Sequence, residues 1–163
     1  MYEKKIDLLF MQQALQEAKK AYKKKEVPVG AVLVLNNKII GRGYNQIELL
    51  KDPTAHAEMI CITSAANYLN NWRLVDTTLY TTVEPCIMCA GAIISARIKK
   101  VIWATTDDRV GANGSWIDVF KTKHPIHNVE VEKGLLELES KFLMKKFFKE
   151  IRAKKSLLNL FSS

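Results

Sequence analysis

Two short segments of the chain hold residues that bind metal ions in proteins. One segment reads H-A-E and contains His56 and Glu58, and the other reads P-C-I-M-C and contains Cys86 and Cys89. Alone, the C-x-x-C pair could be a redox pair, half of a zinc site or two small buried residues, and a single histidine is usually structural. Together the segments offer three zinc donors and one carboxylate, so we expect a zinc site.

The spacing of these donors suits one zinc ion. Cysteines three residues apart at the start of a helix point to the same side, where the positive helix end favours their thiolates. Both could reach one Zn²⁺ at about 2.3 Å, with His56 at about 2.0 Å. Cys61 lies about 140° around the helix from His56 and is expected in the core. The fourth position is then open for water, as in catalytic zinc sites.

Glu58 is the residue expected to move protons. Zinc with two thiolates and a neutral imidazole carries no net charge, so it acidifies water less than zinc held by three histidines would. Because Glu58 is two residues after His56, the two side chains should point in different directions. We therefore predict that Glu58 takes a proton from water and returns protons to the substrate, without binding the metal.

The elements that position these residues follow from hydrophobic periodicity and turn signals. We expect helices over residues 6–24, 54–68, 86–97 and 135–158, and strands over 29–35, 38–44, 77–83, 100–105 and 129–131. Residues 45–53 and 107–116 are expected to be loops. A hairpin followed by alternating strands and helices predicts a three-layer α/β domain over residues 1–163.

Composition limits the class of protein. Apolar residues make up 48% and charged residues 26% of 163 residues, which is typical of a globular domain. The longest apolar run, residues 29–35, is far below the ~18 residues that a membrane helix needs. No apolar signal segment is seen, and three cysteines fit a reducing cytoplasm. The net charge of +8 favours nucleic acid as partner, the alternative being solubility alone.

The last predicted helix combines basic and aromatic residues. Phe147, in step with Leu143 and Ile151, is expected to face the core, whereas Phe148 is expected to stack on RNA bases. The alternative is that the basic residues form a solvated face. Seven of them stand against one acid, Glu150: Lys141, Lys145, Lys146, Lys149, Arg152, Lys154 and Lys155.

The paired motifs H-x-E and P-C-x-x-C form the zinc-deaminase signature. Over essentially its whole length the sequence resembles the bacterial tRNA-specific adenosine deaminases of the zinc-dependent cytidine and deoxycytidylate deaminase superfamily. The stretches that carry this resemblance begin at Glu26 (EVPVGAVLV), Asp52 (DPTAHAEM) and Glu84 (EPCIMCAGA).

The resemblance implies roles for individual residues. His56, Cys86 and Cys89 would hold one Zn²⁺ per subunit, and Glu58 would shuttle protons. Asn45 would hydrogen-bond the flipped nucleoside, although an asparagine after a strand is most often a plain turn residue. The backbone around Ala57 would complete the pocket. Asp107 would contact a ribose beside the target, the alternative being that it caps the following turn.

The resemblance also implies an architecture and a reaction. The family fold is an α/β/α cytidine deaminase-like structure with a five-stranded mixed sheet, and its members form homodimers that bind the tRNA anticodon stem-loop. The implied reaction is hydrolytic deamination of the wobble adenosine to inosine. One alternative is a deaminase of free cytosine, guanine or deoxycytidylate. Another is an RNA-binding module with structural zinc, which would need neither Glu58 nor an open metal position.

Overall fold

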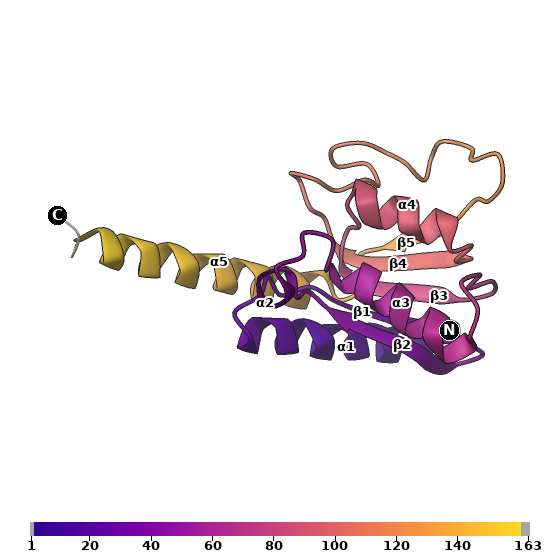
Figure 1. Cartoon of the computed structure of the whole chain (residues 1–163), viewed down its shortest axis with the longest axis horizontal. Helices are drawn as coiled ribbons and strands as arrows, with labels where there is room; N and C mark the ends of the chain where they lie inside the picture. Colours follow the sequence, from indigo (N-terminus) through magenta and orange to yellow (C-terminus); the bar gives the residue numbers. More distant parts are fainter. Residues whose placement is uncertain (1, 161–163) are drawn as a thin grey trace.

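The computed structural model describes the backbone of residues 2–160 and the side chains of residues 4–157 (Figure 1). Within residues 2–160, no helix is both long and apolar enough to cross a membrane. The chain forms, in order, α1 (Tyr2–Lys23), β1 (Gly30–Leu35), β2 (Lys38–Tyr44), α2 (Ile47–Leu50), α3 (Ala57–Leu69), β3 (Thr78–Val83), α4 (Ile87–Ser95), β4 (Lys100–Thr105), β5 (Glu130–Lys133) and α5 (Glu137–Leu160).

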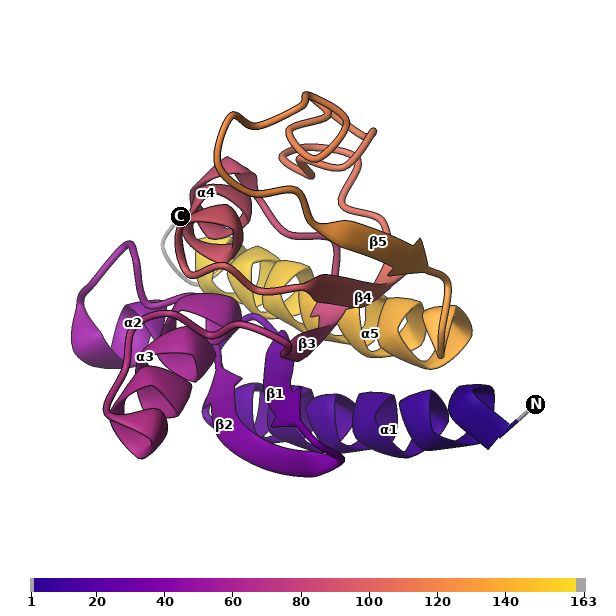
Figure 2. The same ribbon diagram turned by 90° about the vertical axis from the view of Figure 1, so that its right-hand side faces the viewer.

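The strands form one five-stranded mixed sheet in the order β2-β1-β3-β4-β5. β1 runs antiparallel to β2 and β3, whereas β3, β4 and β5 are parallel. The helices α3 and α4 cover one face of the sheet, and α1 and α5 cover the other (Figure 2). The predicted three-layer architecture with a five-stranded mixed sheet is therefore confirmed.

The two faces of β1 supply two separate cores, because successive side chains of a strand point to opposite faces. Ala31 and Leu33 pack toward α3 and α4 together with Cys61. Val32 and Val34 pack toward α1 together with Met11. An apolar run that is buried on both faces explains why β1 lacks the alternating pattern of a half-exposed strand.

Close packing of α3 on β2 places the first predicted metal-binding segment. A Cβ atom at Gly43 would lie 2.2 Å from the carbonyl oxygen of Ala57, so only glycine lets the start of α3 come this close. The predicted helix 54–68 begins later, at Ala57, because the Asp52 side chain accepts the backbone N–H of Thr54 and closes a turn there.

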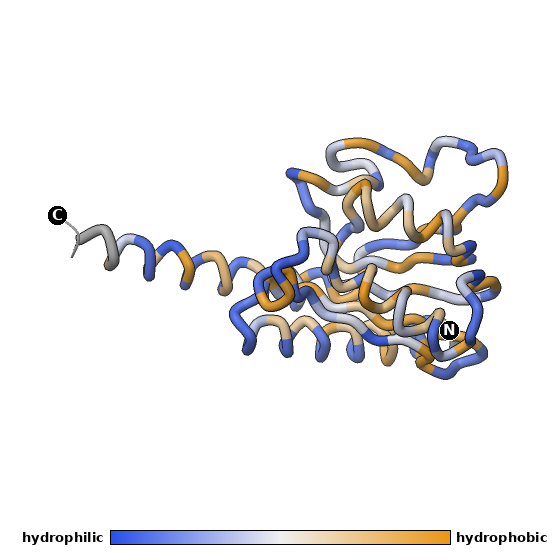
Figure 3. Tube along the Cα trace, viewed as in Figure 1, coloured by the Kyte–Doolittle hydropathy of each residue, from blue (hydrophilic) through white to orange (hydrophobic). Residues whose placement is uncertain are grey.

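Two further expectations need correction. The segment predicted as a loop over 45–53 contains the short helix α2, whose backbone N–H groups are bound by Glu26 from a distant part of the chain. Ile151 does not face the core and is 46% exposed. The end of α5 projects beyond the body of the molecule, so its apolar positions lack a partner surface (Figures 1 and 3).

Candidate active site

Three predicted metal ligands meet where two helices begin. His56 is the N-cap residue of α3, Cys86 is the N-cap residue of α4, and Cys89 lies in the first turn of α4. Their ligand atoms all lie within 4.8 Å of one another. The sheet brings the two helix starts together, since β3 leads into α4 while α3 packs across β2 and β1 on the same face.

The distances fit a tetrahedral zinc ion. The Nδ1 atom of His56 lies 3.6 Å from the Sγ atom of Cys86 and 3.6 Å from that of Cys89. Zinc bonds of about 2.0 Å to nitrogen and 2.3 Å to sulfur give a nitrogen–sulfur edge of about 3.5 Å in a tetrahedron. Two thiolates and one imidazole are a donor set that zinc prefers. The cluster therefore suits Zn²⁺ in both geometry and chemistry.

The ligands also polarise one another. A hydrogen bond from the Cys89 thiol is the main cause that lowers the pKa of Cys86 to about 4. The same hydrogen bond, together with burial, raises the pKa of Cys89. The Cys86 thiolate accepts a hydrogen bond from His56 and so raises the pKa of that imidazole. A bound metal ion would replace these protons, as it does in thiolate sites generally.

Cys61 is not part of this cluster. It is fully buried among apolar side chains of the core on the α3 side, as its position on the helix predicted. Burial raises the pKa of its thiol, so it remains protonated. Among the described residues, the site thus has three protein ligands.

Glu58 lies beside the ligands but outside the ligand group. Its side chain is 3% exposed, and burial raises the pKa of its carboxyl to about 7. Glu58 and His56 both line a cavity of about 170 Å³. A carboxyl group with a pKa near neutrality can both accept and release a proton, which suits an acid–base group.

The same cavity gathers most of the residues implied for substrate binding. Asn45, Ala57 and Asp107 line it together with His56 and Glu58. Asn45 is 4% exposed, and Ala57 is fully buried. Apolar side chains of Val27, Val29, Ile47, Val83 and Val110 form much of the remaining wall. A mostly apolar pocket with a few fixed polar groups is typical of a small-molecule binding site.

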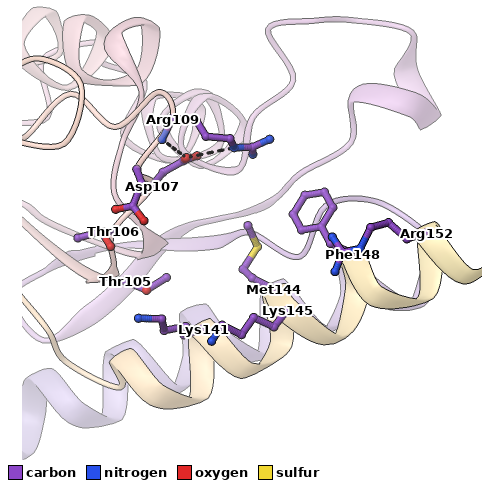
Figure 4. A pocket seen from close by; sticks show the side chains of 10 residues that line it. Thr105, Thr106, Asp107, Arg109, Lys141, Met144, Lys145, Phe148 and Arg152 are labelled. Atoms are coloured by element: carbon purple, nitrogen blue, oxygen red, sulfur yellow. Dashed lines mark hydrogen bonds and ion pairs between the residues drawn. The ribbon is translucent and has the colours of Figure 1, made fainter.

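A second, open cavity of about 410 Å³ adjoins the first, because Asp107, Arg109 and Met144 line both. Figure 4 shows its two walls, the segment after β4 on one side and α5 on the other. We call it the α5 groove. The α5 wall carries Lys141, Lys145, Phe148 and Arg152. Phe148 therefore lies in the groove, and its contact with RNA stays a prediction. Phe147, which was predicted to face the core, is 7% exposed and packs against Tyr22.

Asp107 stands where the two cavities meet. One oxygen of its carboxylate accepts the backbone N–H of Arg109 at 3.1 Å, and the Arg109 side chain lies 3.7 Å away. The turn-capping role weighed for this residue is thus present. The proposed contact with a ribose stays a prediction.

Two buried carboxylates beside the cavity escaped the sequence reasoning. Glu26 is 2% exposed and binds the side-chain amide of Asn45. Glu84 is 3% exposed and accepts backbone N–H groups of Asp107, Asn113 and Ser115. Both residues begin stretches that carry the family resemblance, and each lies close to a predicted apolar strand, but neither signal assigns a role to the side chain.

The zinc-binding region of the cytidine and deoxycytidylate deaminases matches residues 4–105 of this chain. The chain belongs to this deaminase family. The matched residues 4–105 include all three metal ligands and Glu58. Membership and the donor geometry together identify zinc as the metal of this deaminase.

Curated relatives of this deaminase include a "tRNA-specific adenosine deaminase" from Bacillus subtilis, 44% identical over 91% of this chain and 92% of that one. The chloroplastic "tRNA(adenine(34)) deaminase" of Arabidopsis thaliana is 48% identical over 88% of this chain, which spans 12% of that protein's length. A solved structure from a study of A-to-I editing by tRNA:A34 deaminases is 42% identical, with a TM-score of 0.79 over 82% of this chain and 97% of that one.

Proposed function

We propose that this deaminase converts the wobble adenosine of a tRNA anticodon to inosine by hydrolysis. One observation carries the proposal: the small pocket beside the zinc ligands continues into the basic and aromatic α5 groove. An enzyme for free bases needs only the small pocket. Neighbouring nucleotides of an RNA loop would occupy the groove, and the named activity of the relatives supports the same substrate.

The reaction replaces the C6 amino group of adenine by oxygen from water, so that a C–O bond forms, a C–N bond breaks and ammonia leaves. Zinc, when bound by His56, Cys86 and Cys89, supplies the Lewis acidity that makes water a nucleophile near neutral pH. Glu58 accepts the proton of the attacking water and delivers protons to the ring and to the leaving amine. Its burial keeps bulk water from competing for those protons.

The other residues are proposed to bind the RNA. Asn45 and the backbone at Ala57 hold the flipped nucleoside in the pocket. Asp107 accepts a hydrogen bond from a neighbouring ribose, and Phe148 stacks on a base in the α5 groove. Lys141, Lys145 and Arg152 lie on the same wall as Phe148 and would neutralise phosphates there.

We also propose that the chain works as a cytoplasmic homodimer, as its family resemblance implies. Leu49, Leu50 and Ile87 are each at least 50% exposed close to the cavity, which supports an interface on this side. Light scattering should give twice the mass of one chain. Ile87→Glu should shift the mass to that of one chain, and a wild-type mass of one chain would contradict the dimer.

The decisive experiment measures inosine and ammonia from an anticodon stem-loop with adenosine at the wobble position. A stem-loop with guanosine at that position is the matched control. Free adenosine, guanine, cytosine and deoxycytidylate test the alternative enzyme classes. We expect inosine from the adenosine stem-loop alone. Turnover of a free base with an inert stem-loop would favour the small-molecule deaminase, and binding without any turnover would favour an RNA-binding module.

A further inference from the structure

Glu26 holds the side-chain amide of Asn45 beside the substrate pocket. The Nδ2 atom of Asn45 donates to an Oε atom of Glu26 at 3.2 Å, and both residues are almost fully buried. The same carboxylate accepts the backbone N–H groups of Leu49 at 2.6 Å and of Glu48 at 3.2 Å. Every partner of this carboxylate among the described residues is a donor, so Glu26 acts only as an acceptor here.

This contact decides which end of the amide faces Glu26. A carboxamide can rotate by half a turn and exchange its donor and acceptor at little conformational cost. Beside a carboxylate, only the orientation with the nitrogen toward Glu26 makes a hydrogen bond, and the reverse would place two acceptor oxygens together. The oxygen of Asn45 is therefore directed away from Glu26, and Asn45 lines the pocket.

We propose that Glu26 is a positioning residue that sets the polarity of the pocket by fixing Asn45 with its acceptor oxygen toward the bound nucleotide. This inference rests on the proposed function. Adenosine offers donors at its amino group and sugar hydroxyls, whereas the ring atoms N3 and N7 are acceptors. The oxygen of Asn45 can therefore accept from an amino or hydroxyl group, while only the second hydrogen of its nitrogen stays free to donate.

The same carboxylate also ties this amide to α2. Because Glu26 bonds the backbone at Glu48 and Leu49, the short helix and Asn45 are held by one group. Ile47 of α2 lines the pocket too. Glu26 thus holds both the α2 wall of the pocket and the side-chain amide of Asn45.

An exchange of the two groups tests the proposal. One oxygen of Glu26 accepts Leu49 at 2.6 Å, and the other accepts Asn45 and Glu48, each at 3.2 Å. In Glu26→Gln the side-chain oxygen should keep the shorter bond to Leu49, so the new amide nitrogen faces Asn45, which must rotate to present its oxygen to that nitrogen. In Asn45→Asp two carboxylates face each other. Each variant should lower kcat/KM on the stem-loop by roughly tenfold or more. In the double variant, the introduced amide donates to the introduced carboxylate, whose second oxygen restores the acceptor toward the ligand. Its kcat/KM should therefore return to within about threefold of wild type.

The control is Glu17→Gln, the same change at a carboxylate that is 2% exposed but binds Lys20 and Arg42 outside the pocket. It should leave kcat/KM unchanged. Melting temperature and zinc content are measured for every variant. A double variant that is no more active than Glu26→Gln would overturn the proposal. If neither single variant folds, the double variant decides alone by its activity relative to wild type.

A second readout separates this inference from the proposed function. The Asn45 carboxamide resonances can be assigned by their absence in Asn45→Asp. The Asn45 side-chain N–H proton that Glu26 accepts should be protected from exchange with solvent in wild type and should lose this protection in Glu26→Gln. That result supports the positioning role even if no RNA is deaminated. Equal protection of this proton in wild type and Glu26→Gln refutes the role even if the enzyme is active.

Discussion

The carboxylate of Glu84 accepts the backbone N–H of Asn113 at 2.8 Å, across 29 residues of sequence. It also accepts the N–H groups of Asp107 and Ser115. Glu84 is two residues before the metal ligand Cys86, so this buried side chain ties the segment that leads into the metal ligands to the loop that forms a wall of both cavities.

Replacing Glu84 by Gln should loosen that loop. The amide nitrogen would face a backbone donor, and leaving such a buried group unpaired costs about 1–3 kcal/mol. We expect faster amide hydrogen exchange over residues 107–115, while the remote segment of α3 stays protected. Equal exchange in the two proteins would show that Glu84 does not hold the loop.

Removal of one zinc ligand should remove the metal. Elemental analysis of the purified wild type should give one Zn²⁺ per chain, and Cys86→Ala should lose zinc and activity together. Cys61→Ala is the matched control, because Cys61 lies in the core and should leave the zinc content unchanged. Full zinc occupancy in Cys86→Ala, or an active wild type without zinc, would refute the ligand set.

Glu58→Gln should separate catalysis from metal binding. The amide keeps the shape of the side chain but cannot carry the proton, so the rate should fall by at least ~10²-fold. Zinc content and affinity for the stem-loop should match those of wild type, because Glu58 lies outside the ligand group. Loss of zinc from this variant would instead make Glu58 a ligand.

The neighbouring phenylalanines of α5 should respond in opposite ways. Phe148→Ala should weaken binding of the stem-loop by about 1–3 kcal/mol, the usual value of a base stack, with little change in melting temperature. Phe147→Ala should lower the free energy of unfolding by about 3–5 kcal/mol, because Phe147 is buried against Tyr22. Calorimetry and binding titrations of both variants distinguish the two roles, and a large loss of stability in Phe148→Ala would place Phe148 in the core.

Asp107→Asn tests recognition of ribose. The side-chain oxygen of asparagine can still accept the Arg109 N–H, so the turn that Asp107 caps should persist. In RNA a 2′-hydroxyl would donate a hydrogen bond to this carboxylate, whereas a deoxyribose would leave its negative charge without a partner. The substitution removes that charge. We expect a smaller ratio of RNA to DNA deamination on matched single-stranded loops. An unchanged ratio would leave Asp107 with the turn-capping role alone.

The sequence by itself determined the group of metal-ligating residues and the order of the main elements, whereas the proton-transfer role of Glu58 stays a prediction. His56, Cys86 and Cys89 could be recognised because the donor types and the spacing at two helix starts limit the chemistry. The strands and long helices followed from local periodicity, which depends only on neighbours along the chain. Burial of Cys61 and Phe147 followed in the same way.

Only the tertiary structure decided the relations between distant segments. Glu26 and Glu84 bind amides 19 to 31 residues away, and no local pattern encodes such partners. The helix α2 depends on one of these contacts, so its short segment read as a loop. Ile151 kept the helical period of a core residue, but the sheet does not extend far enough to cover it. Periodicity indicates which side of a helix is apolar. Only the tertiary structure shows how much of that side is covered by the rest of the molecule.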